Sequence, residues 1–97
     1  MILMKEIMLF SSIGSSSIHH SMPKGAYITD AFLMNGAVYI SVLVDDTQPY
    51  VTRRFHLTGP FNTMNITQGV RCWHVGTVEI PTPGGASYRY YVIESEN

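Results

Sequence analysis

The residues best suited to chemistry are arginines and aromatic side chains in the second half of the chain. An arginine fork can bind a phosphate through two parallel hydrogen bonds, and an aromatic face can stack on a nucleobase. Both types fall on the last three predicted strands, which we expect to be neighbours. The pattern indicates a pocket for a small anionic nucleotide, with these ligand-binding candidates: Arg53, Arg54, Arg71, Trp73, Tyr88, Arg89, Tyr90 and Tyr91.

A structural role also explains these residues one at a time. Arg71 and Arg89 can be cross-strand partners of Glu79 and Glu94, and the tyrosines can be interface aromatics. Adjacent arginines in a strand, such as Arg53-Arg54, point to opposite faces of the sheet. The structural role is therefore favoured for any single residue, and the pocket is favoured for the set if copies of the chain assemble.

Three other groups of polar residues are of types that bind metals or act as nucleophiles, but their spacing does not suit either role. His19-His20 point apart in a strand and lack a third metal ligand, and Asp45-Asp46 more simply ends a strand. Cys72 and His74 share a face at i and i+2, but no motif activates them, so we expect a buried cysteine beside a hydrogen-bonded histidine. No P-loop, nucleophile elbow, dinucleotide fingerprint or HExxH is present. The sequence thus predicts no catalytic residues, no metal site, no cofactor and no enzyme.

The elements that must position these residues are short strands. Alternating apolar residues between regular turn signals predict strands at 3–10, 18–22, 26–34, 37–44, 51–58, 70–80 and 86–94. The first should be covered on both faces, because it is apolar on both parities. In the sixth, Cys72 and His74 should share a face with Gly76 and Val78. A loop follows at 59–68, where one helical turn could form at 62–66. We predict a single all-β domain over 1–97, a small antiparallel sandwich or partly open barrel of about seven short strands.

The strongest local signal is a hairpin within 22–46. A turn at Met22–Gly25 starts it, Asn35-Gly36 forms its loop, and Asp45-Asp46 ends it. Its second strand has a β-branched face that must be core, formed by Val38, Ile40, Val42 and Val44. Its other faces are also apolar, with Tyr39 and Leu43 on the second strand and Ile28, Phe32 and Met34 on the first. One small domain has one core, so we expect these outward faces to meet copies of the chain.

Composition supports that expectation. Only 13% of the residues are charged and 45% are hydrophobic, against about 25% charged in ordinary soluble domains, which favours a homo-oligomer. Six basic residues and a net charge of −1 are too few to bind a DNA or RNA polymer by counterion release. The lone Cys72 excludes an internal disulfide and fits a reducing compartment. Lys5 and Glu6 interrupt the apolar start, so it indicates a strand rather than a signal peptide or membrane span.

The order of short motifs resembles a family of small phage-encoded proteins of uncharacterised function. The family pattern runs MPKGA-x-I, NG, LVD, RRF, a glycine, GTV and an aromatic strand. The chain departs from it in an insert at Pro81–Gly85 and in Phe32 and Met34, which replace polar outward residues. The matching segments are Met22–Ala26, Ile28, Asn35–Gly36, Leu43–Asp45, Arg53–Phe55, Gly59, Val75–Val78 and Tyr88–Val92.

The resemblance implies a phage protein that acts in the cytoplasm of a bacterial host. Several small phage proteins sequester nucleotide messengers of bacterial immunity. By analogy, we expect an oligomeric binding protein that holds such a signal without degrading it. Two alternatives stay open: a protein–protein module that docks on a host enzyme and inhibits it, and a minor virion accessory protein.

Overall fold

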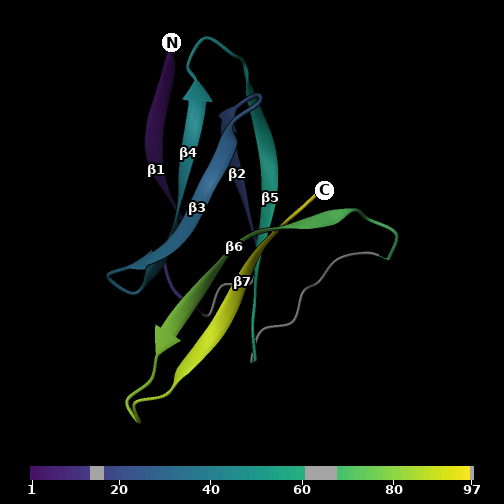
Figure 1. Cartoon of the computed structure of the whole chain (residues 1–97). Helices are drawn as coiled ribbons and strands as arrows, with labels where there is room; N and C mark the ends of the chain where they lie inside the picture. The colour runs from purple at the N-terminus through teal and green to yellow at the C-terminus, as the bar shows by residue number, and fades with distance from the viewer. Residues whose placement is uncertain (14–16, 61–67, 97) are drawn as a thin grey trace.

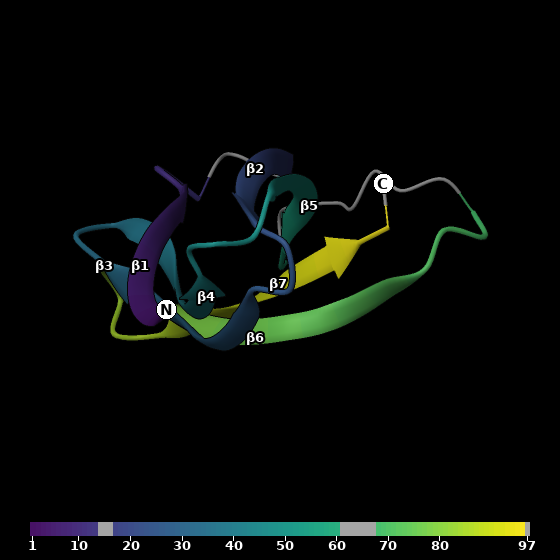
Figure 2. The same ribbon diagram turned by 90° about the horizontal axis from the view of Figure 1, so that it is seen from above.

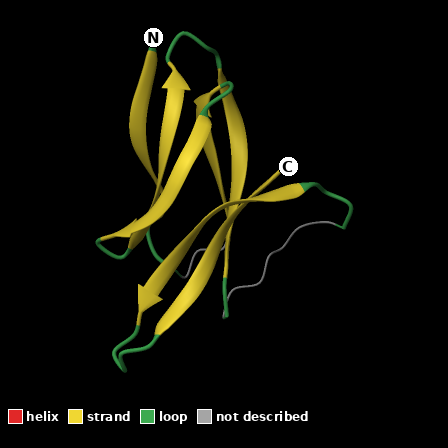
Figure 3. Ribbon diagram, in the orientation of Figure 1, coloured by secondary structure: helices red, strands yellow, loops and turns green. Residues whose placement is uncertain are grey.

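The computed structural model describes residues 1–13, 17–60 and 68–96, and these residues form seven strands (Figures 1 and 3). The predicted all-β class is confirmed, and the described residues include no helix, hence none that could cross a membrane. The helical turn considered at 62–66 lies outside the described residues. The strands are β1 (Ile2–Phe10), β2 (Ser17–Pro23), β3 (Tyr27–Met34), β4 (Ala37–Asp45), β5 (Tyr50–Thr58), β6 (Cys72–Pro81) and β7 (Ser87–Ser95).

The strands form two antiparallel sheets that do not close into a barrel. The three-stranded sheet has the order β1-β4-β3, and the four-stranded sheet has the order β2-β5-β7-β6. The last three strands are therefore neighbours, as predicted. Figure 2 shows that β6 and β7 run beneath the three-stranded sheet, and Figure 1 shows their hairpin reaching past the ends of the other strands. We call the face of each sheet that turns toward the other sheet its inner face, and the opposite one its outer face.

The core fills the space between the inner faces. The β-branched face of β4 is buried as predicted, with Val38, Ile40 and Val42 at 0% exposure. It packs with Phe55 and Leu57 of β5, which are equally buried. Burying a side chain of this size stabilises the fold by about 1.5–3 kcal/mol, so these strands hold the two sheets together.

The turns predicted at Asn35-Gly36 and after Asp45 are confirmed, whereas the one predicted at Met22–Gly25 begins at Pro23, the last residue of β2, whose carbonyl accepts from the Ala26 amide at 3.1 Å. Met34 pairs with Ala37 across a two-residue loop in which Asn35 and Gly36 have φ of 52° and 77°. Positive φ at both central positions defines the type I′ turn, whose twist matches that of the strands it joins. After β4, the Asp45 carboxylate accepts hydrogen bonds from the Thr47 amide at 3.0 Å and the Thr47 hydroxyl at 2.6 Å. These bonds lower the pKa of Asp45 below its ordinary value.

Bulges overturn two predicted faces. An extra residue, Thr29, interrupts the β3–β4 pairing, and another, Val75, interrupts the β6–β7 pairing. Because each extra residue reverses the side-chain parity beyond it, Ile28 faces inward opposite Val42 rather than outward with Phe32. In β6, Cys72 and His74 lie on the outer face, whereas Val78 lies on the inner one. The single face predicted for Cys72, His74, Gly76 and Val78 is therefore wrong.

The prediction that β1 is covered on both faces is also wrong. Met4 and Met8 are 57% and 47% exposed. Their partners on β4, Leu43 and Tyr39, lie on the outer face of the three-stranded sheet, and no described element packs there. The other parity of β1, with Leu3 and Ile7, packs on the core, as do Leu9 and Phe10 at the end of the strand, where the register shifts.

Candidate functional site

A pocket of about 220 Å³ opens where β3 passes beside β6. Its walls come from the start of β3, from β5, and from the paired ends of β6 and β7. Such a space is smaller than a drug-sized site of about 300–1,000 Å³ but can admit one flat ring. The lining residues are Ala26, Tyr27, Ile28, Arg53, Trp73, His74, Val75 and Glu94.

The bulges of β3 and β6 position this pocket. Both occur beside it, since the lining includes Ile28 next to Thr29 and also Val75 itself. Bulges re-aim side chains and are common next to functional sites. The bulge at Val75 places Trp73 on the inner face opposite Glu94. A Cβ at Gly76 would lie 2.4 Å from the Cβ of Ala31, so glycine lets the two strands approach this closely.

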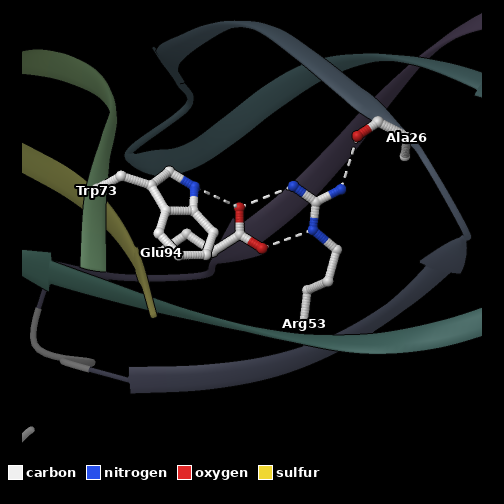
Figure 4. Close-up of polar contacts among 4 residues, drawn as sticks. All are labelled: Ala26, Arg53, Trp73 and Glu94. Atoms are coloured by element: carbon white, nitrogen blue, oxygen red, sulfur yellow. Dashed lines mark hydrogen bonds and ion pairs between the residues drawn. The ribbon is translucent and has the colours of Figure 1, made fainter. Parts of the chain in front are cut away.

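A bidentate ion pair between Arg53 and Glu94 forms one wall of the pocket (Figure 4). The guanidinium donates from Nε to Oε2 at 2.6 Å and from Nη2 to Oε1 at 2.7 Å, and its Nη1 donates to the Ala26 carbonyl at 2.7 Å. The Glu94 side chain is 4% exposed and that of Arg53 is 20% exposed. Charge-assisted, two-point contacts in such a sheltered place fix the orientation of both groups.

Trp73 completes the network, because its indole Nε1 donates to Glu94 Oε1 at 3.1 Å (Figure 4). The hydrogen bond holds the ring at the pocket while 43% of the residue stays exposed. Tyr27 enters the pocket lining from the opposite strand, β3. The ring of Trp73 thus borders a space whose lining also includes the apolar Ala26 and Ile28.

The electrostatics of the wall are nearly neutral. Glu94 offsets the charge of Arg53, and the contacts with Glu94 and Ala26 use three of the five N–H groups of a guanidinium. The other two N–H donors make no hydrogen bond to any residue that the structure describes. They can recognise acceptors on a base edge, whereas a phosphate would compete with a carboxylate that already holds the fork.

The predicted ligand-binding residues divide between surfaces. Arg53 and Trp73 meet at the pocket, while Tyr88 and Tyr90 share the inner face of β7 with Glu94, away from the pocket lining. Tyr90 is a core residue at 2% exposure. The outer face carries Arg54, Arg89 and Tyr91, and Arg71 lies just before β6 with its side chain 83% exposed. The structure therefore brings together two of the eight candidates.

The sequence left open which of Arg71 and Arg89 pairs with Glu79 and which with Glu94. Arg89 lies 3.2 Å from Glu79 across the β6–β7 pair, so one cross-strand pair is present. Glu94 is held by Arg53, which the sequence did not suggest, and Arg71 Nε lies 3.8 Å from Glu96 Oε1. Sequence reasoning gave Glu94 no part in the pocket. Its parity was the available signal, since an acid on the same face as the buried Val92 must find a cationic partner.

A second polar cluster lies on the outer face of the four-stranded sheet. His56 is fully buried; its Nδ1 is 2.9 Å from Ser17 Oγ and its Nε2 is 2.9 Å from Ser95 Oγ. Hydroxyls can donate or accept, so they satisfy either tautomer of the ring. Burial, then the nearby charges of Arg54 and His19, lower the pKa of His56. This cluster lines no described pocket, and we assign it a structural role.

Cys72 is exposed, so the predicted buried position is wrong. It lies at the start of β6, before the Val75 bulge, on the outer face. His74 shares that face, as predicted, and its Nε2 lies 2.9 Å from Thr77 Oγ1. His19 and His20 point to opposite faces of β2. Within the described ranges, no three His, Cys, Asp or Glu side chains gather in a way that could hold a metal ion.

Comparisons with protein-family models, with curated proteins and with solved structures find no match to this chain. The assignment of the pocket therefore depends on its geometry and chemistry.

Proposed function

We propose that the chain is a non-enzymatic binding protein that holds a small nucleotide-type ligand in the pocket between β3 and β6. The observation that supports this is the ring of Trp73, which a hydrogen bond to Glu94 holds at a pocket walled by a fixed arginine and also lined by Tyr27. Base–aromatic stacking contributes about 1–3 kcal/mol per base. The resemblance to phage-encoded proteins suggests the role: sequestration of a nucleotide signal of the bacterial host's antiviral immunity.

The neutral wall indicates which part of the ligand enters. Because Glu94 already offsets Arg53, we expect the base in the pocket and the phosphate near its mouth. The two N–H donors of Arg53 that no described residue accepts from can match the paired acceptors on the edge of a guanine. We therefore expect the ligand to be a purine nucleotide, with guanine as its base.

Titration of the single tryptophan tests the proposal, since Trp73 is the only one in the chain. Guanine, adenine and pyrimidine nucleotides, linear and cyclic, are added while Trp73 fluorescence and calorimetric heat are recorded. We expect guanine nucleotides to bind most tightly and ribose phosphate without a base not to bind. Trp73→Ala should abolish binding measured by heat, and Tyr91→Ala, on the outer face, should not change it. Failure of every nucleotide to bind at millimolar concentration would overturn the proposal.

The homo-oligomer expected from composition remains part of the proposal, and the edge strand β1 supports it. No described strand pairs with its outer edge, and only Lys5 and Glu6 are charged within its nine residues. An apolar strand edge can pair with the same strand of a second copy. The hydrogen bond from the Asp46 amide to the Met1 carbonyl places Ile7 among the residues whose backbone groups face β4, so the amide of Glu6 faces the free edge. Light scattering should then give a dimer that Glu6→Pro dissociates, because proline removes this outward backbone donor. A monomer at high concentration would contradict this part of the proposal.

A further inference from the structure

The outer face of the three-stranded sheet carries two apolar rows that cross all three strands. The first row is Met4 of β1, Leu43 of β4 and Tyr27 of β3, which are register partners. The second row is Met8, Tyr39 and Phe32, in which the Tyr39 and Phe32 rings stack with centroids 5.6 Å apart. The inner face of the same sheet already supplies the core. A sheet that is apolar on both faces is normally covered on both.

An acidic row lies between the two apolar rows. Ser41 of β4 pairs with Glu6 on one side and with Asp30 on the other. Both acids are exposed, and neither forms an ion pair with any described residue. Successive rows on one face are about 6.6 Å apart along the strands. The face therefore presents a negative centre between apolar bands about 13 Å apart.

The charges on this face exclude two of its possible occupants. A two-fold stack of the face on itself would set the acidic row against itself or against an apolar row. No basic residue of the chain lies on this face to offset the acidic row. Lys5 points to the inner face, Lys24 lies in the turn before β3, and the four arginines all follow β4 in the sequence. Anionic lipid headgroups would be repelled by the same carboxylates.

We propose that the outer face of the three-stranded sheet docks a partner protein through an apolar surface with a lysine or arginine at its centre. The apolar side chains of the partner cover the two rows, and its cation sits between Glu6 and Asp30. Desolvated charge pairs at protein interfaces contribute about 1.5 kcal/mol or more, which corresponds to about tenfold in affinity. The proposal does not depend on the nucleotide pocket.

Two synthetic peptides test it. Both are amphipathic helices of about 18 residues, long enough to fold on a surface, with a leucine stripe that carries either one Lys or one Glu at its centre. We expect the Lys peptide to bind about tenfold more tightly than the Glu peptide. The double variant Glu6→Gln/Asp30→Asn should remove that difference, and Leu43→Ser should weaken both peptides. Tyr91→Ser, a matched change of an exposed aromatic on the other sheet, should weaken neither, and circular dichroism verifies that each variant is folded.

Several results would overturn the proposal. Equal affinity for the two peptides, or no binding of either, would show that the acidic row does not select a cation. Self-association of the wild-type chain that Leu43→Ser abolishes would assign the face to a second copy. Binding to vesicles of anionic phospholipid that Leu43→Ser abolishes would assign it to a membrane surface.

Discussion

Removing Arg53 or Glu94 alone should destabilise the fold nearly as much as removing both. In Arg53→Met, the Glu94 carboxylate, 4% exposed, keeps its bond from Trp73 as its one side-chain contact among the described residues. An uncompensated buried charge typically costs about 3–5 kcal/mol, and we expect the lower end because carboxylates at a pocket can reach water. In Glu94→Leu, Arg53 loses two charge-assisted bonds but is 20% exposed, so we expect about 2–3 kcal/mol. The double variant should lose about 3 kcal/mol, which gives a coupling energy of about 2–3 kcal/mol.

Urea unfolding of the four proteins, followed by far-ultraviolet circular dichroism, measures this cycle. The matched control is Arg89–Glu79, an ion pair at 3.2 Å whose side chains are 61% and 59% exposed. Solvent screening should limit its coupling energy to below about 1 kcal/mol. A coupling energy for Arg53–Glu94 no larger than that of the control would refute the reasoning. It would mean that water reaches the pair and that the pocket wall is not fixed.

Three further predictions concern stability. Because the pKa of His56 is lowered in the folded chain, the unfolded chain binds a proton at this residue more readily. The contribution of His56 to the free energy of unfolding should therefore be fully present above about pH 6.5 and should decrease as the pH falls below that value. Thermal melts at several pH values should show this decrease, and His56→Gln should reduce it. Gly76→Ala should cost about 1–3 kcal/mol in urea unfolding, because the new Cβ meets Ala31, whereas Gly84→Ala, with open space around it, should cost much less. Gly36→Ala should cost about 1 kcal/mol in the same assay, because φ is 77° there; an unchanged midpoint would show that the turn relaxes.

The sequence was sufficient where structure is local. The Asn35-Gly36 loop and the β-branched face of β4 follow from backbone preferences and from period-two alternation, and both are present. The bulges were not predictable in this way, because one extra residue leaves composition unchanged while reversing every side chain beyond it. The bulge at Val75 alone separates Cys72 from Val78 and sends Trp73 inward.

The candidate site was predictable only in part for a related reason. Placing Arg53 and Trp73 together required only that their strands be close in one sheet, which the sequence indicated. The partner of Arg53 depended on the order β5-β7-β6, which sets Glu94 between Arg53 and Trp73. The sequence had suggested Arg71 or Arg89 as the partner of Glu94 instead. Long-range pairings of this kind are decided by sheet order, which no local preference encodes.

Tyr27 joins the two surfaces proposed above. It lines the pocket, and it also belongs to the apolar row of Met4 and Leu43. A partner seated on that row covers Tyr27 at the edge of the pocket, so partner and nucleotide should weaken each other's binding by the same factor. Tyr27→Ala should therefore weaken both nucleotide and Lys peptide, whereas Met8→Ser should weaken only the peptide and Trp73→Ala only the nucleotide. Independent binding of the two ligands to the wild-type chain would place at least one of them away from Tyr27.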